Sequence, residues 1–121
     1  MPEQPLPGPQ GPADVRGKLH ELSRLLRRAD HLDPDAQREL ADLVDELADS
    51  LNPAALQSAE GTHLADSTAH LARALNRPHD TGLLASAKKR LEESIIRAEN
   101  EVPLASGLAR NLLDILANLG I

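Results

Sequence analysis

The chain of 121 residues has no cysteine, phenylalanine, tyrosine or tryptophan. The absence of cysteine excludes disulfides and thiol catalysis, and the absence of aromatic rings leaves nucleic-acid bases without a stacking platform. Large β-branched residues are few, whereas leucine recurs at spacings of three and four from Leu19 to Leu119. Because this leucine spacing favours helices and the missing residues are those that favour strands, the sequence predicts an all-α protein.

The sequence also lacks the features that nucleic-acid-binding, membrane-spanning and secreted proteins have. The formal net charge is −6, which disfavours binding to the phosphate backbone of nucleic acids. No apolar run approaches the roughly 20 residues of a membrane-spanning helix, and no secretory signal is visible at the N-terminus. We therefore expect a cytoplasmic protein with no nucleic-acid partner, no membrane partner and no evident small-molecule substrate. A last helix lying on a membrane surface is a weaker alternative, because Arg110 and Asp114 on its polar face do not give the usual basic excess.

Proline and glycine mark the organisation of the chain. Residues 1–12 are rich in both and predict a disordered N-terminal arm, followed by a single helical domain over residues 13–121. The domain is predicted to be a small antiparallel bundle of four to five helices, at about 14–30, 34–51, 54–76, 81–99 and 103–119. Gly61 is a predicted weak point of the third helix, because an interior glycine costs roughly 1 kcal/mol relative to alanine.

The outer faces of the first two predicted helices carry opposite charges. The face of 14–30 is basic and that of 34–51 is acidic. A short turn makes the two helices antiparallel neighbours, which is expected to place Arg24 near Asp42 and Lys18 near Glu46 and Asp49. The alternative is that the two faces are solvated independently, since exposed ion pairs contribute only about 0–1 kcal/mol each.

The predicted helix 103–119 has more apolar surface than one neighbour can cover, because its apolar residues span about half of the helix circumference. Ile96, on the preceding helix, also falls outside the apolar stripe of that helix. The predicted interaction face consists of Ile96, Leu104, Leu108, Leu112, Leu113, Leu116 and Leu119.

The sequence offers one arrangement that could bind a metal. Glu60 and His63 form a Glu-x-x-His motif, and His63, Asp66 and His70 share one helical face. Di-iron bundles use two such motifs and two further glutamates, so we predict no metal site and no cofactor. No nucleophile elbow or phosphate-binding glycine loop is present, and no catalytic residue is predicted. The alternative is a ferritin-like metal-binding bundle or metal-dependent enzyme.

The C-terminal part of the chain resembles a known family. Leu91-Glu92-Glu93, Ala98-Glu99, Pro103-Leu104 and the closing Leu116-Ala117-Asn118-Leu119-Gly120-Ile121 are similar to the signature of small bacterial helical proteins grouped as a domain of unknown function. The layout of Arg16–Leu51 is also similar, whereas Asn52–Asp80 looks like additional material. Glu101-Val102 departs from the Ser-His that is common in the family. The resemblance implies a bacterial origin and a helical fold, and it carries over no catalytic residues.

These observations predict a non-enzymatic helical interaction or oligomerisation protein. Its partner would be a second copy of the chain or another helical protein, and it would dock by packing helix against helix rather than through a chemical site. We expect the contact to involve the two helices predicted at 81–99 and 103–119.

Overall fold

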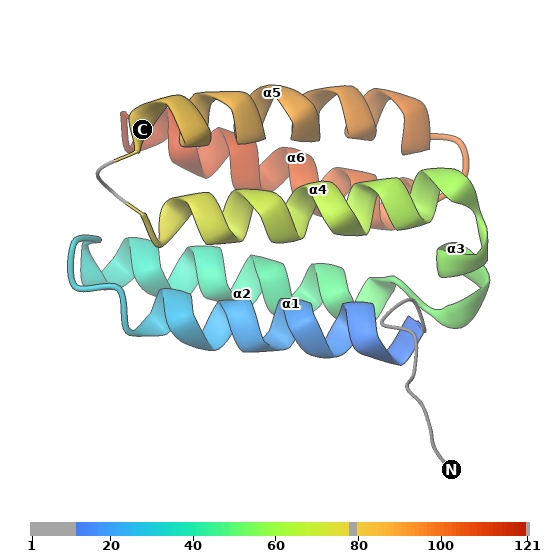
Figure 1. Ribbon diagram of the computed structural model, residues 1–121, viewed down its shortest axis with the longest axis horizontal. Coiled ribbons are helices and arrows are strands. Elements are labelled where there is room, and N and C mark those ends of the chain that lie inside the picture. Colours follow the sequence, from blue (N-terminus) through green and yellow to red (C-terminus); the bar gives the residue numbers. More distant parts are fainter. Residues whose placement is uncertain (1–11, 78–79, 121) are drawn as a thin grey trace, which may run out of the picture.

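The computed structural model describes residues 12–77 and 80–120 and is helical throughout its regular structure (Figure 1). The helices are α1 (Pro12–Arg27), α2 (Pro34–Ser50), α3 (Pro53–Gln57), α4 (Ala59–Leu75), α5 (Thr81–Ala98) and α6 (Pro103–Asn118). This confirms the predicted all-α bundle. Residues 1–11 of the predicted N-terminal arm lie outside the described residues. Pro12 belongs to α1, which begins two residues earlier than predicted because proline suits the first helical position.

Proline and polar caps set most of the helix starts, as the sequence predicts. The Asp33 carboxylate accepts a hydrogen bond from the Asp35 amide (3.1 Å), directly before Pro34 at the start of α2. The Asp80 carboxylate does the same for the amide of Leu83 (3.0 Å) at the start of α5. These caps satisfy amides that have no partner inside the first helical turn.

The five long helices form a closed ring (Figure 1). Each packs mainly against two neighbours, in the order α1, α2, α6, α5, α4 and back to α1, and α2 also touches α4. Four of the five neighbouring pairs run antiparallel, and α1 and α4 run in the same direction. The short α3 covers one end of the ring. No described helix is long and apolar enough to cross a lipid bilayer.

The break in the third predicted helix lies at Ser58 rather than at Gly61. Ser58 separates α3 from α4 and caps α4, because its hydroxyl oxygen accepts a hydrogen bond from the Gly61 amide (2.9 Å). Gly61 is buried inside α4, and a Cβ at this position would overlap the carbonyl oxygen of Ala55 in α3. The glycine therefore permits a close approach between two helices and does not interrupt one.

Leucines fill the centre of the ring, and small residues line one seam of it. The largest fully buried side chains include Leu19, Leu40, Leu64, Leu91 and Leu112, one from each long helix, as the leucine spacing predicts. Between α4 and α5 the core contains alanines and a buried pair of hydroxyls, Ser67 and Ser94, whose Oγ atoms lie 2.6 Å apart. Small residues let two helix backbones approach closely.

Candidate functional site

One side of α6 belongs to the core of the bundle. Leu112 and Leu116 are fully buried, and α6 packs against both α2 and α5. The expectation that one neighbour could not cover the apolar arc of this helix was sound, but a second helix of the same chain covers much of it. Leu112 and Leu116, predicted as part of an interaction face, are therefore core residues, and Leu113 is half-buried.

A second apolar stripe of α6 lies at the edge of the core. Leu104 is 68% exposed and Leu119, directly after the end of the helix, is 40% exposed. Leu108 and Ile115 are half-buried, and the exposed Asn111 lies between them. We call this set the α6 stripe: Leu104, Leu108, Asn111, Ile115 and Leu119.

The spacing of the α6 stripe is that of a helix-pairing seam. From Leu104 to Ile115 the steps are four, three and four residues, the pattern that keeps one side of a helix facing a partner helix. Asn111 in this pattern is a polar residue at a seam position, which in coiled coils selects one register. The predicted interaction face includes neither Asn111 nor Ile115, although the four-three-four spacing could have separated this stripe from the core stripe.

The α6 stripe borders a shallow groove between α2 and α6, which we call the α2–α6 groove. A hollow of about 390 Å³ in its middle is lined by Glu39, Asp42, Leu43, Glu46, Asn111, Asp114 and Ile115. A second hollow of about 380 Å³ lies at the start of α6, where Leu104 and Glu101 meet Ser50 and residues of α3 and its flanks. Since α2 and α6 run antiparallel, both hollows lie along the same boundary.

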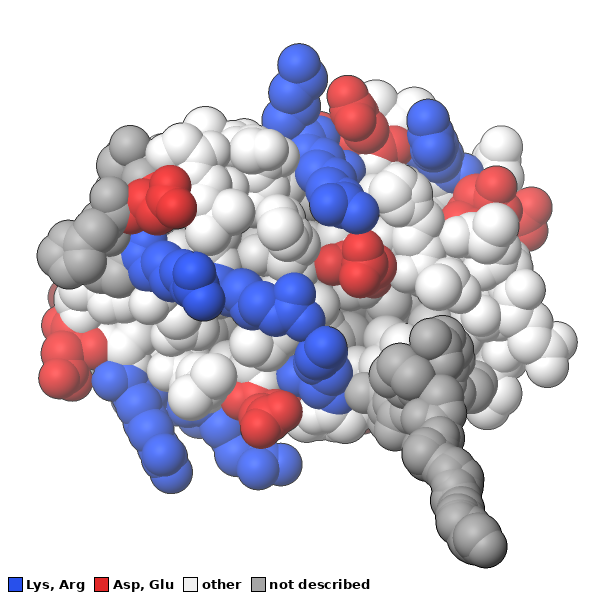
Figure 2. Space-filling view, viewed as in Figure 1, with Lys and Arg blue, Asp and Glu red and all other residues white. Residues whose placement is uncertain are grey.

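Carboxylates dominate the polar part of the α2–α6 groove. Of the described residues that line its two hollows, five are acidic and none is basic. Asp42 forms an ion pair with Arg27 (2.8 Å). Glu39, Glu46 and Asp114 are exposed and have no ion-pair partner among the described residues. The face shown in Figure 2, which presents α1, α4 and α5 and lies away from this groove, carries charges of both signs, with a row of basic side chains across its middle.

Ile96, the remaining residue of the predicted face, lies on α5 and is 69% exposed. It lines neither hollow of the α2–α6 groove. Ile96 and Leu104 thus have almost equal exposure on different helices, and only Leu104 belongs to the α6 stripe.

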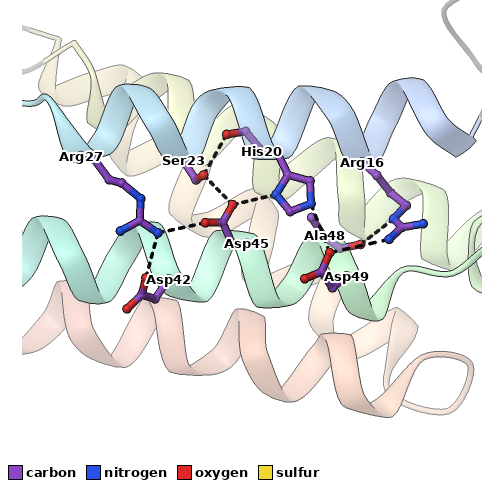
Figure 3. Close-up of polar contacts among 8 residues, drawn as sticks. All are labelled: Arg16, His20, Ser23, Arg27, Asp42, Asp45, Ala48 and Asp49. Atoms are coloured by element: carbon purple, nitrogen blue, oxygen red, sulfur yellow. Dashed lines mark hydrogen bonds and ion pairs between the residues drawn. The ribbon is translucent and has the colours of Figure 1, made fainter.

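A row of polar contacts joins α1 to α2 (Figure 3). Arg27 contacts the carboxylates of Asp42 (2.8 Å) and Asp45 (3.0 Å). The His20 ring places Nδ1 2.8 Å from Asp45 and Nε2 3.2 Å from Asp49. The predicted antiparallel pairing is correct, but Asp42 pairs with Arg27, three residues beyond the predicted Arg24, and the exposed Lys18 and Arg24 form none of these pairs. The α1 residues in the row are Arg16, His20, Ser23 and Arg27.

The His20, Ser23 and Asp45 side chains meet, but their order is not that of a nucleophile and its base. The Ser23 hydroxyl lies 2.6 Å from the Asp45 carboxylate and 2.8 Å from the backbone carbonyl of His20, so its contacts are with these oxygens rather than with the imidazole ring. Ser23 is also only 1% exposed. Since a nucleophile needs an adjacent base and access to substrate, this cluster joins two helices rather than forming a reaction centre.

The surroundings of Asp45 hold its pKa below the ordinary value. Partial burial, the largest single influence, raises the pKa of this carboxyl, but hydrogen bonds from Ser23, His20 and Arg27 together outweigh it. Hydrogen bonds of this kind favour the ionised form. Asp45 is therefore an ionised acceptor at the centre of the α1–α2 contact.

The residues considered for a metal site lie on α4, where Glu60, His63 and His70 are each half-buried. Asp66, on the same helix, pairs with Arg90 of α5 (3.1 Å). In residues 12–77 and 80–120, no three His, Asp or Glu side chains gather as metal ligands would.

A larger hollow, of about 530 Å³, opens at the end of the bundle where the α1–α2 connection meets α4 and α5. Leu75 and Leu84 contribute apolar surface, and His31, Arg77 and Asp80 lie around it. The Nε2 atom of His31 donates to the carbonyl of Leu75 at the end of α4 (2.7 Å). This histidine therefore caps the C-terminal end of α4 by bonding a carbonyl that has no partner within the helix.

Comparison with family models, with curated proteins and with solved structures finds no match to this chain. The resemblance of its C-terminal residues to a bacterial family of unknown function thus remains a prediction.

Proposed function

We propose that this chain is a non-enzymatic helical interaction protein whose docking surface is the α6 stripe together with the α2–α6 groove. The observation that carries the proposal is the second apolar stripe of α6, which the bundle leaves partly uncovered although the rest of that helix packs in the core. The expected cytoplasmic location belongs to the same proposal.

The spacing of the stripe favours a helix as the occupant. A partner helix can place apolar side chains between Leu104, Leu108 and Ile115 and a polar side chain opposite Asn111. That helix belongs either to a second copy of the chain or to another protein.

Two measurements test this function without assuming the charge of the partner. Sedimentation equilibrium at tens of micromolar reports self-association. Titration with a synthetic amphipathic peptide, with leucines at the four-three-four spacing and glutamine on its polar face, reports docking. We expect at least one of the two to be positive.

Leu104→Glu and Ile96→Glu form a matched pair of variants, because the two side chains are 68% and 69% exposed. Both variants should keep the melting temperature of the parent. Leu104→Glu should abolish the observed association, whereas Ile96→Glu should retain it. A chain that is monomeric and binds no helical peptide would contradict the proposed function, and equal effects of the two variants would contradict its location.

A further inference from the structure

The charges beside the α6 stripe indicate which kind of partner helix binds in the α2–α6 groove. On the α2 side of the α2–α6 groove, Glu39 and Glu46 project beside Leu43, and on the α6 side Asp114 lies beside Ile115. All three carboxylates are exposed and have no ion-pair partner in the described parts of the chain. An apolar stripe with acidic flanks complements a helix with an apolar stripe and basic flanks.

A second copy of the chain offers these carboxylates no basic partners when the same surface of each copy forms the contact. If α6 paired with its own copy about a two-fold axis, the carboxylates beside each stripe would face those of the other, because such an interface brings the same patch together twice. Like charges facing each other across an interface are unfavourable.

The face of a second copy shown in Figure 2 does not supply the apolar half of the contact, although it carries basic side chains. On the helices that this face presents, the exposed large apolar side chains are Leu25 of α1 (44% exposed) and Ile96 of α5 (69% exposed). Because α1 and α5 are not neighbours in the ring, these two side chains cannot fill a seam that runs from Leu104 to Ile115 at helical spacing.

We infer that the occupant of the α2–α6 groove is a cationic amphipathic helix from a different protein, an inference that rests on the docking function proposed above. Its apolar residues pack on the α6 stripe, and its lysines or arginines pair with Glu39, Glu46 and Asp114. The stripe from Leu104 to Ile115 corresponds to about 17 Å of helix, or roughly three turns. A helix of this kind has a basic polar face and a narrow leucine face.

Three synthetic peptides of about 18 residues, each roughly 27 Å long as a helix, test the inference. They share the leucine stripe and differ only in a lysine, glutamine or glutamate polar face. Because the chain has no tryptophan or tyrosine, one tryptophan in each peptide is the only strong fluorophore in the mixture. Its fluorescence anisotropy reports binding to the full chain.

We expect the lysine peptide to bind about tenfold more tightly than the glutamine peptide, because each exposed ion pair at the rim contributes only a few-fold in affinity. The glutamate peptide should bind more weakly than both. The advantage of the lysine peptide should disappear toward 1 M salt, where the screening length falls to about 3 Å.

Two double variants with the same net charge show whether the lysine peptide is attracted by the carboxylates of the α2–α6 groove or by the overall negative charge of the protein. Glu39→Gln with Glu46→Gln should remove most of the lysine preference, leaving only the contribution of Asp114, whereas Glu92→Gln with Glu93→Gln, exposed glutamates of α5, should retain it. Leu104→Glu should remove binding of the lysine and glutamine peptides.

Four results would overturn the inference. If the glutamine peptide binds as tightly as the lysine peptide, the charge argument is wrong while the docking function stands. If both double variants reduce binding equally, the attraction is not specific to the groove. If no peptide binds and the chain forms a dimer that Leu104→Glu dissociates, the occupant is a second copy. Absence of both peptide binding and self-association would overturn the proposed function as well.

Discussion

The carbonyl group of Ala55 occupies the space that a side chain at Gly61 would need. A Cβ built on Gly61 would overlap the carbonyl oxygen and lie 2.9 Å from its carbon, with the Ser58 hydroxyl oxygen at 3.0 Å. The contact brings the last turn of α3 against the first turn of α4. Because two of these neighbours are backbone atoms, they cannot move aside without shifting a helix.

Gly61→Ala should therefore destabilise the protein, although alanine favours helices by roughly 1 kcal/mol over glycine. Overfilling a packed site typically costs about 1–3 kcal/mol, so we expect a net loss of that order in urea unfolding. Gly107→Ala is the matched control, because no atom beyond the adjoining residues and backbone of α6 lies within 4 Å of its Cβ position, and it should gain about 0.5–1 kcal/mol. A stabilised Gly61→Ala variant would show that α3 does not pack on α4 in this way.

Asp45→Asn should destabilise the fold at pH 7 by about 1–3 kcal/mol, because Asp45 accepts hydrogen bonds from Ser23, His20 and Arg27. Asp42→Asn, at a 53% exposed carboxylate that contacts Arg27, should cost less than about 1 kcal/mol. Urea unfolding of both variants at one pH makes this comparison.

The effect of Asp45→Asn should depend on pH in a definite direction. The pKa of Asp45 in the folded protein is lowered from its ordinary value of 3.8. Its ionised form therefore stabilises the fold fully above the unfolded pKa, and this contribution is lost as the pH falls through the folded pKa. The difference between the parent and the variant should shrink below about pH 4, and a difference that grows there would contradict the assigned contacts.

The buried serine pair should respond unequally to alanine. Ser94 Oγ donates to the carbonyl of Arg90 (3.0 Å), so its oxygen accepts from Ser67. Ser94→Ala leaves the fully buried Ser67 hydroxyl without this partner and should cost about 1–3 kcal/mol. Ser67→Ala leaves Ser94 bonded to Arg90 and should cost less than about 1 kcal/mol. Equal losses in thermal unfolding would contradict the assigned direction of donation, and a larger loss for Ser67→Ala would reverse it.

Leu112→Ala or Leu116→Ala should each cost about 2–5 kcal/mol in urea unfolding, because both side chains lie in the core. Leu104→Ala, at a 68% exposed position, should change stability by less than about 0.5 kcal/mol. A large loss at Leu104 would mean that the isolated chain covers the α6 stripe.

The sequence predicts the helices and the antiparallel pairing of α1 with α2 because both depend on local signals. Asp33-Pro34 begins α2 as expected, and the short turn before it brings the residues near Arg27 beside Asp42. The α1 residues expected to contact α2 were wrong: the residues at four-three-four spacing that include His20 and Ser23 face α2, and Lys18 and Arg24 face solvent. To predict which polar residues of α1 face α2, one must know which sides of α1 the other helices cover.

The division of the α6 leucines also depends on packing between distant parts of the chain. Leu112 and Leu104 look alike in the sequence, yet one is buried between α2 and α5 and the other is exposed. Likewise, the low helix propensity of glycine predicts that a glycine weakens the helix in which it lies. That Gly61 instead admits the carbonyl of Ala55 follows only from the position of α3.

The odd number of helices in the ring places the beginning of α1 and the end of α6 at opposite poles (Figure 1). Because the chain has no cysteine, Lys18→Cys with Asn118→Cys would provide the sole attachment points for a donor and an acceptor dye. Lys18 lies nine residues before the end of α1, so in the folded protein the two dyes would be separated by about 14 Å along the bundle axis, in addition to their separation across the bundle. Energy transfer between them would then report expansion of the chain directly, one molecule at a time.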